Sequence, residues 1–220
     1  MTRPSYHHGD LANALTAAAT QLARDGGPDA VVLREAARKV GVSATAAYRH
    51  FASHGELIHA VKHVAADRLA ERMKIELART QPLPDPGPEA VRRLRALGNG
   101  YLRFAVDEPG LFRTAFCNPA AAQVATVEIM SVEHALDMAL VDPFRMLMET
   151  VEELARTGML APERRPWAEI FAWSAVHGLA MLLLDGPLQA CSPDEREQVI
   201  ARVLDGVADG LVPPSPGPRA

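Results

Sequence analysis

Apolar residues recur at three- and four-residue steps along most of this chain, which is the spacing that lines one face of an α-helix. Between residues 33 and 51 the pattern predicts two short helices. One face of the first helix carries Leu33, Ala36, Ala37 and Val40. Gly41 follows, where a helix end needs positive φ, and Ser43 offers an oxygen to cap the second helix. With Ala47 and Phe51 facing inward, this is the pattern of a helix-turn-helix, whose second helix enters the DNA major groove.

The same spacing continues on both sides of this motif. Four prolines between residues 82 and 88 predict a loop rather than a helix. The other predicted helices cover residues 11–25, 54–80, 89–106, 119 into the 130–139 region, 143–157, 167–184 and 193–211, with a short turn at 109–116. No segment alternates as a strand does. We predict an all-α fold, in which an N-terminal three-helix head is joined by a long helix to a larger C-terminal helical domain.

Composition limits the classes of protein to consider. The 220 residues are 48% hydrophobic, and no apolar run is long enough to span a bilayer. The N-terminus lacks the apolar region of a signal peptide, so we expect a cytoplasmic protein. Cys117 and Cys191 lie far apart without metal-ligand spacing, which indicates small buried or half-buried residues rather than a disulfide or a site.

The distribution of charge agrees with the position of the helix-turn-helix. The net charge is −4, yet residues 1–70 hold eight Lys and Arg against six Asp and Glu. Six of the eight histidines also precede residue 64. The mildly basic part of the chain therefore coincides with the motif expected to meet phosphate.

On these residues the sequence resembles the TetR family of bacterial transcriptional regulators. The match covers roughly residues 8–60 and combines the first helix, the spacing of the motif and the signature Tyr48-Arg49-His50-Phe51. Ser53 and Leu57-Ile58 extend it. A further stretch, Trp173 to Gly178, is similar to the Trp-x-x-x-His-Gly motif of one subset of TetR-like C-terminal domains.

The resemblance implies a homodimer that binds a palindromic double-stranded operator through two heads, either about 34–36 Å apart or at another spacing that pairs of dimers accommodate. The implied C-terminal domain holds a small, largely apolar effector, which changes the separation of the heads, and we expect a repressor. The corresponding divisions are 1–53 for DNA binding, 54–212 for effector binding and dimerisation, and 213–220 as a disordered tail. No cofactor, metal or membrane partner is expected.

Seven residues of the head are expected to contact DNA. They are Arg34, Ser43, Thr45, Tyr48, Arg49, His50 and His54. By the resemblance, Tyr48 and His50 contact phosphate and fix the register. The alanines of the recognition helix leave base readout to Thr45, Arg49 and Arg34. His54 replaces the Lys of many family members, which predicts weaker phosphate anchorage.

Large apolar residues of the C-terminal part are the candidates for an effector site. We expect it among Tyr101, Phe104, Phe112, Phe116, Met130, Phe144, Met148, Trp173 and His177. Most such residues serve only as core, and His177 could equally be a satisfied core histidine. His59 and His63 have a spacing that suits zinc, but no further ligands accompany them, so we expect no metal site.

Apolar faces of the last two predicted helices are the candidates for the dimer contact. The dimer should use Ile170, Ala175, Leu179 and Leu182–Leu184 with Val199, Val203 and Val207, unless these faces are buried in the monomer core.

Two other functions are alternatives to a ligand-responsive regulator. A ligand-independent DNA-binding protein is one of them. A small helical enzyme is the other, although the sequence has no Gly-x-Ser-x-Gly motif, no Gly-rich phosphate loop and no paired catalytic set. We therefore expect no enzyme.

Overall fold

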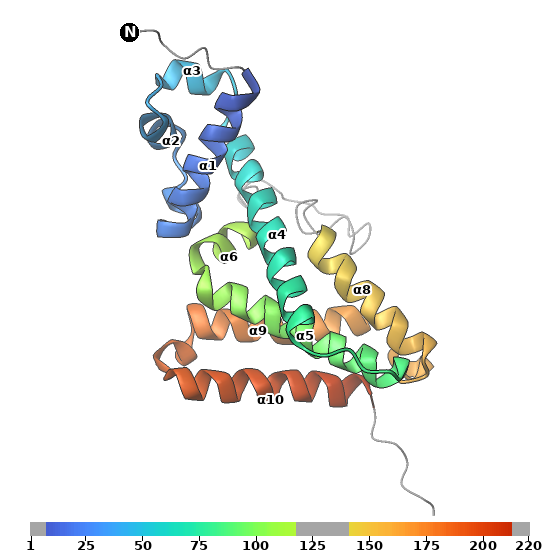
Figure 1. Ribbon diagram of the computed structural model, residues 1–220. Helices are drawn as coiled ribbons and strands as arrows, with labels where there is room; N and C mark the ends of the chain where they lie inside the picture. The colour runs from blue at the N-terminus through green and yellow to red at the C-terminus, as the bar shows by residue number, and fades with distance from the viewer. Residues whose placement is uncertain (1–7, 118–140, 213–220) are drawn as a thin grey trace, which may run out of the picture. The chain divides into compact units, whose positions relative to one another are not determined.

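The computed structural model describes residues 8–117 and 141–212 (Figure 1). Within these ranges the secondary structure is helical and contains no strand, which confirms the all-α prediction. The helices are α1 (His8–Gly26), α2 (Leu33–Val40), α3 (Ala44–Tyr48), α4 (His54–Arg79), α5 (Pro86–Asp107), α6 (Pro109–Phe116), α8 (Val141–Arg156), α9 (Ala168–Leu184) and α10 (Pro193–Leu211). Short 3-10 turns lie at Pro28–Ala30, Pro162–Arg164 and Pro187–Ala190. The helix predicted from residue 119 and the tail at 213–220 lie outside the described residues.

The chain forms two compact units. The first contains the described residues of the ranges 1–68 and 108–141, so it holds α1, α2, α3, α6 and the first part of α4. The second contains residues 69–107 and those from Asp142 onward, with the rest of α4, α5, α8, α9 and α10. None of the helices in the described ranges is long and apolar enough to cross a membrane.

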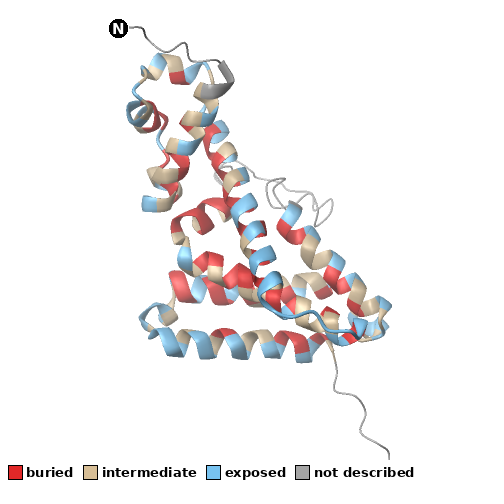
Figure 2. Cartoon of the chain, viewed as in Figure 1, coloured by how far each residue is buried: buried red, intermediate tan, exposed pale blue. Residues whose placement is uncertain are grey.

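In the first unit, α1 packs against both α2 and α6. Fully buried apolar side chains from α1, α4 and α6 form its core (Figure 2); they are Leu15, Ala19, Leu57, Ile58, Val61, Leu111 and Phe112. The apolar face predicted for α4 is therefore confirmed where Leu57, Ile58 and Val61 lie.

Local caps shape the helix-turn-helix as the sequence predicts. Gly41 ends α2 with a φ of 78°, in the left-handed region that glycine tolerates. The side-chain oxygen of Ser43 accepts a hydrogen bond from the backbone N–H of Ala46 at 3.2 Å and caps α3. Ala37 and Ala47 are buried, and their small side chains let α2 and α3 pack closely.

In the second unit, α9 packs against α5 and α10. A cluster of buried apolar side chains from α5, α8, α9 and α10 makes the core; it comprises Ala90, Leu94, Val151, Leu154, Leu160, Ala168, Ala172, Val207 and Leu211. The predicted N-terminus of α10 is confirmed, because Ser192 and Glu195 form a capping box ahead of it.

The predicted start of the helix that follows the proline-rich loop is wrong. The loop assigned to the four prolines ends early, because α5 begins at Pro86 rather than at Glu89. Pro86 and Pro88 fall in the first turn of a helix, where backbone N–H groups have no intrahelical acceptor and their loss costs little. Prolines therefore mark the start of this helix as well as the loop before it.

Candidate functional site

The seven residues expected at DNA lie on the helix-turn-helix and at the start of α4. Six of them have exposed side chains: Arg34, Ser43, Thr45, Tyr48, Arg49 and His54. His50 is half-buried. The Tyr48 side chain is 46% exposed although it is aromatic, while Ala47 beside it is fully buried. Helix α3 thus turns a small apolar face to the core and presents Thr45, Tyr48 and Arg49 outward.

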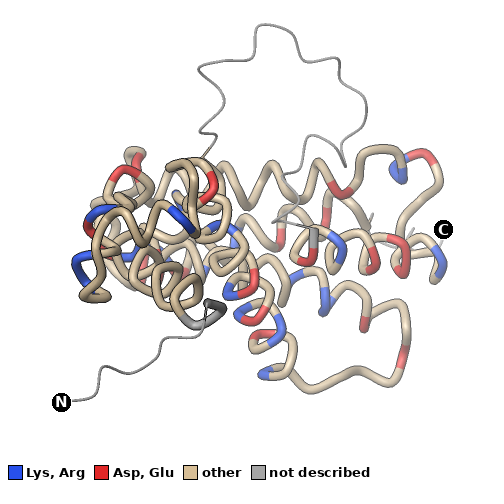
Figure 3. The backbone as a smooth tube through the Cα atoms, turned by 90° about the horizontal axis from the view of Figure 1, so that it is seen from above, with Lys and Arg blue, Asp and Glu red and all other residues tan. Residues whose placement is uncertain are grey.

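Charged side chains on this surface differ in whether they form ion pairs within the protein. Arg38 of α2 pairs with Glu35 one turn away, at 2.9 Å. Within the described part of the chain, Arg34, Lys39 and Arg49 have no ion pair. On α2 the single acid Glu35 stands among three cations, and Figure 3 shows Lys and Arg as well as Asp and Glu distributed over the chain. The cations without protein partners are available to phosphate or to base edges.

Glu56 is a residue of this surface that the sequence analysis did not single out. The side-chain oxygen of Ser53 accepts from the backbone N–H of Glu56 at 3.1 Å and so caps the start of α4. The Glu56 carboxylate in turn accepts from the backbone N–H of Ala52 at 2.8 Å. Together these bonds fix the junction between α3 and α4, where His54 stands. The Ser-x-x-Glu spacing was the signal that would have revealed it.

Helix α6 belongs to the same compact unit and is held to α1 and α4. At its start, Glu108 forms a double hydrogen bond with the guanidinium of Arg24, the last cation of α1. At its end, the buried Lys62 side chain of α4 donates to the carbonyl oxygen of Cys117 at 2.8 Å. A cation beside the last carbonyls of a helix is favourable for the helix dipole.

Gly110 allows α6 to approach α1 at very short range. A Cβ at this position would lie 2.2 Å from the carbonyl oxygen of Ala23 and 2.5 Å from that of Arg24. Any side chain there would therefore collide with backbone. No local pattern in the sequence predicts this contact, since the two segments are far apart in the chain.

The candidate effector residues are divided between the two units. Six of them lie in the second unit, on α5, α8 and α9: Tyr101, Phe104, Phe144, Met148, Trp173 and His177. Phe112 and Phe116 lie on α6 in the first unit, where their rings pack with centroids 4.8 Å apart. Met130 lies outside the described residues.

Four of these side chains form one aromatic cluster in the second unit. The ring of Trp173 lies 5.9 Å from that of Phe144 and 5.7 Å from that of His177, measured between centroids. The rings of Tyr101 and His177 meet edge to face at 6.3 Å. We call these four residues, from three helices, the ring cluster.

Hydrogen bonds connect the polar atoms of the ring cluster. The indole N–H of Trp173 donates to the hydroxyl oxygen of Tyr101 at 3.3 Å, and that hydroxyl lies 2.7 Å from Nδ1 of His177. Burial lowers the pKa of His177, because the charged imidazolium would lose its hydration. Burial also raises the pKa of the Tyr101 phenol. Both side chains are therefore neutral at pH 7.

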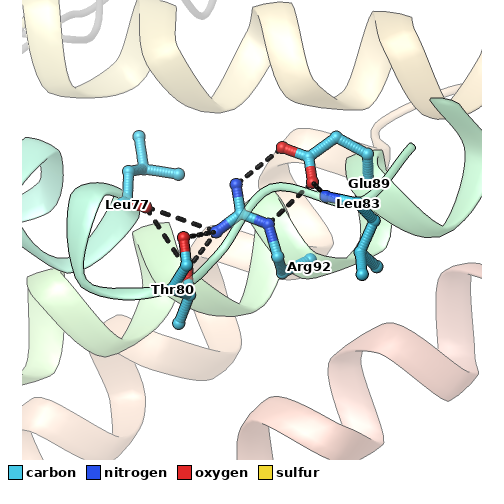
Figure 4. A network of polar contacts seen from close by, with 5 residues as sticks. All are labelled: Leu77, Thr80, Leu83, Glu89 and Arg92. Atoms are coloured by element: carbon cyan, nitrogen blue, oxygen red, sulfur yellow. Dashed lines mark hydrogen bonds and ion pairs between the residues drawn. The ribbon is translucent and has the colours of Figure 1, made fainter. Parts of the chain in front are cut away.

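A separate open groove of about 680 Å³ lies in the second unit between α5 and α10. Its described lining contains none of the candidate effector residues. One edge is held by Arg92, which bonds Glu89 on its own helix and the carbonyl oxygens of Leu77 and Thr80 at the end of α4 (Figure 4). Glu89 also accepts from the backbone N–H of Leu83 at 2.9 Å. This network ties the ends of α4 and α5 together.

His59 and His63 lie on an exposed face of α4 with ring centroids 4.5 Å apart. Across the described ranges, no group of three or more His, Cys, Asp and Glu side chains is placed to hold a metal ion.

Part of the expected dimer face lies in the monomer core. Leu179, Leu183 and Val207 are nearly fully buried within the second unit itself. Other apolar side chains of α9 are exposed: Leu182, which belongs to the expected face, is 44% exposed, and Phe171 is 49% exposed. Because α9 is apolar on every side, its sequence could not show which face the monomer covers.

Comparisons with known proteins agree with this architecture. The family model "Tetracyclin repressor-like, C-terminal domain" matches residues 94–207, more than half of the chain. The model "Bacterial regulatory proteins, tetR family" matches residues 15–61, across the helix-turn-helix. The chain belongs to the TetR family. It is therefore a TetR-family transcriptional regulator with a DNA-binding head, as the resemblance indicated.

Solved structures of similar fold cover nearly the whole chain. A protein of unknown function from Rhodococcus sp. RHA1 is 25% identical, with a TM-score of 0.70, over 96% of this chain and 100% of that one. A TetR family transcription regulator from Marinobacter aquaeolei VT8 is 18% identical, with a TM-score of 0.61, over 92% and 95%. A bacterial regulatory protein in the tetR family from Rhodococcus RHA1 is also 18% identical, with a TM-score of 0.60, over 92% and 97%. No curated protein matches the chain in sequence.

Proposed function

We propose that this TetR-family regulator is a homodimeric repressor, released from a palindromic operator by a small, largely apolar effector. The observation that carries the proposal is the outward face of α2 and α3. There Tyr48 is half-exposed and Arg34 and Arg49 have no ion pair among the described residues, while Ala47 anchors the other side of α3 in the core. An exposed aromatic beside uncommitted cations is what a surface for the DNA backbone and base edges requires.

The proposed roles follow from the chemistry of each side chain. Arg49 and Arg34 read base edges, and Thr45 places its methyl group against thymine. Tyr48, His50, Ser43 and His54 contact phosphate oxygens. His54 begins α4, so its ring lies at the positive end of a helix dipole, which also favours a phosphate there.

The second copy is proposed to bind the exposed face of α9 and its neighbour α10. Phe171, Gly178 and Leu182 follow one another on that face, and a Cβ on Gly178 or on Gly206 of α10 would have no neighbour within 4 Å among the described residues. Figure 2 shows the outward face of α10 exposed along most of its length. Apolar side chains next to small residues suit close packing of helices in a bundle. Residues 54–212 are the part we assign to dimerisation and effector binding, and residues 1–53 to DNA binding.

A paired test separates the dimer from the fold. Phe171→Glu with Leu182→Glu should convert the protein to a monomer in sedimentation, since two carboxylates would be buried at the contact. Ile75→Glu, at an equally exposed apolar position of the same unit, is the control and should stay dimeric. A wild-type chain that sediments as a monomer at micromolar concentration would refute the dimer.

Footprinting on the DNA upstream of the protein's own gene tests the function as a whole. We expect protection of two half-sites on one face of the duplex, lost in Arg49→Ala, and reduced transcription in vitro when the site is filled. Uniform protection without a defined site would favour a ligand-independent DNA-binding protein. Turnover of a bound small molecule that persists in Arg49→Ala and Tyr48→Ala would favour an enzyme.

A further inference from the structure

The groove between α5 and α10 has an aliphatic wall. Its described lining contains no aromatic side chain, and Leu83 at its edge is 44% exposed. Its volume of about 680 Å³ falls in the range of small-molecule sites. The groove therefore suits an alkyl chain rather than a stacked ring. The larger apolar residues of the lining are Leu83, Pro88, Val91, Met159, Leu204 and Val212.

Helix α10 gives one of its faces to this groove. The lining residues of α10 recur at three- and four-residue steps, as the residues on one side of a helix do. Gly206, at the proposed dimer contact, is not among them, because each residue turns the helix by about 100° from the one before. The groove thus uses a different face of α10 from the proposed dimer contact. The lining residues of α10 are Ala201, Leu204, Asp205, Ala208, Asp209 and Val212.

The cations that line the groove are already paired. Arg92 bonds Glu89 on its own helix at 2.7 Å. Arg95 lies 3.1 Å from the carboxylate of Asp205. Within the described part of the chain, the carboxylate of Asp209 has neither an ion pair nor a hydrogen bond. The groove therefore has one carboxylate whose charge is not neutralised and no arginine left for an anion.

Asp209 stands in the last turn of α10, which ends at Leu211. The carbonyl groups at the end of a helix carry the negative end of its dipole, so a cation is favourable there. The last turn of α10 contains no basic residue. Arg164, from another part of the unit, donates to the carbonyl oxygen of Gly210 at 2.5 Å. The carboxylate of Asp209 and the helix dipole therefore both favour a positive group at this end of α10.

Another part of the lining holds the end of α4. Thr80, Arg92 and Asn99 all line the groove. Arg92 donates to the carbonyl oxygens of Leu77 and Thr80 (Figure 4), and the Asn99 amide donates to the buried carboxylate of Glu76 at 3.0 Å. A molecule in the groove would therefore contact the residues that fix the end of α4, the helix that continues into the first unit.

From these observations we propose that the effector is an aliphatic ammonium, whose alkyl chain lies in the groove between α5 and α10 and whose charged head group pairs with Asp209. The proposal rests on the proposed function, because it assigns the effector and its site. Carboxylates and other anions are excluded, since the arginines of the lining are paired. A metal ion is excluded as well, because one carboxylate in an apolar groove does not supply the several oxygens that a hard cation needs.

The first test uses three probes that share a ten-carbon chain: decylamine, decanol and decanoate. In calorimetry on the full-length protein without DNA, decylamine should bind about 2- to 10-fold more tightly than decanol, because one exposed ion pair at a helix end separates them. Decanoate should bind most weakly. Raising the salt concentration to about 0.5 M should reduce the preference for the amine, since salt screens an exposed pair.

Substitutions locate the two parts of the probe. Asp209→Asn should remove the preference for decylamine and leave the affinity for decanol unchanged. Asp194→Asn, an exposed carboxylate at the opposite end of the same helix, is the matched control and should keep the preference. Ala201→Trp places a large side chain in the groove and should weaken the binding of all three probes.

Equal affinity for decylamine and decanol, tighter binding of decanoate, or a preference that survives Asp209→Asn overturns the inference. Binding of decylamine only after removal of residues 213–220 would assign the groove to that segment of the chain instead. Binding only by the variant with Phe171→Glu and Leu182→Glu would assign it to the second copy. Either result also overturns the inference.

A second test separates the inference from the proposed function. Operator affinity is measured by fluorescence anisotropy, and Asp209→Asn should need more decylamine than the wild type or Asp194→Asn to release the operator. If the wild type binds no operator while the preference for decylamine is present, the proposed function fails and the ligand class stands. If the wild type binds its operator and saturating decylamine does not release it, the groove is not the effector site and the inference fails.

Discussion

Arg24 and Glu108 are 84 residues apart in the sequence and form a two-pronged ion pair, with Nε–Oε2 at 2.6 Å and Nη2–Oε1 at 3.1 Å. The pair connects the last turn of α1 to the residue immediately before α6. Arg68 of α4 adds a second cation 3.5 Å from the same carboxylate. The hydrogen bond to Glu108 raises the pKa of Arg24. One carboxylate thus holds three helices of the first unit together.

A double-mutant cycle should measure this pair in the free energy of unfolding. Because both side chains are only about a third exposed or less, we expect a coupling of about 1 kcal/mol for Arg24→Gln with Glu108→Gln. The exposed pair of Glu35 and Arg38 is the control, and its coupling should stay below about 0.5 kcal/mol. Urea unfolding followed by circular dichroism gives both values. Equal couplings would contradict the special role of Glu108.

Gly110→Ala should destabilise the protein. The new Cβ would lie 2.2 Å from a backbone oxygen of α1, and neither helix can yield as a side chain would. Overpacking of this kind costs roughly 1–3 kcal/mol. Gly55→Ala is the control, since its Cβ would meet only the Ser53 oxygen, at 3.7 Å, and helix propensity favours alanine there. A thermal scan in which Gly110→Ala melts no lower than the wild type would show that α6 does not need this approach.

The bond between Glu89 and Arg92 should make stability depend on pH. The hydrogen bond from Arg92, helped by the backbone N–H of Leu83, lowers the pKa of Glu89 from 4.5 to about 2. A pKa that is lower in the folded state stabilises the fold above the unfolded value, and this stability is lost as pH falls from about 5 toward 2.

At pH 7 we therefore expect Glu89→Gln to be less stable than the wild type by about 1 kcal/mol in the free energy of unfolding, because the pair is partly exposed. Near pH 2 the stabilities of the two proteins should become similar. Glu163→Gln, an exposed site in the same unit, should melt with the wild type at every pH. If the difference in stability between Glu89→Gln and the wild type does not change with pH, the charge of Glu89 is not the cause of that difference.

Substitutions of Arg49 and of Tyr48 should change operator binding in different ways. Arg49→Ala removes the proposed base contact and should lose about 1–3 kcal/mol of discrimination at one base pair, so that substituted operators bind as well as the natural one. Tyr48→Phe removes the proposed phosphate contact and should weaken natural and substituted operators alike. Anisotropy titrations against single-base variants of the footprinted site distinguish the two. The opposite pattern would exchange the roles of these residues.

The elements that the sequence predicted correctly depend on neighbours in the chain. Gly41 marks the end of α2, and Ser43, two residues later, caps the start of α3. Ser192 likewise caps the start of α10. Pro86 misled the boundary of α5 because proline is compatible both with a loop and with a first helical turn. Local signals with a single physical meaning were thus reliable.

The relationships that the sequence could not provide are those between distant segments. Trp173 and His177, four residues apart, were visible as one helical face, but their partner Tyr101 lies 72 residues away from Trp173. The pairing of Arg24 with Glu108 had no local signal at all. On α9 the apolar residues surround the helix, so only the packed structure shows that Leu179 is core and Phe171 is surface.

Helix α4 passes from one compact unit to the other between Arg68 and Leu69 without a break. From Leu69 back to His54 the helix measures about 22 Å at 1.5 Å per residue, and it acts as a lever. A tilt of about 5° at Leu69 displaces His54 by roughly 2 Å over that length. The second crossing, at Asp107–Glu108, has non-helical dihedrals at Glu108 and precedes Pro109, which restricts them. Small angular changes are thereby magnified along the helix, so under the proposed function an effector that moves its own surroundings very little carries the DNA-binding head out of register.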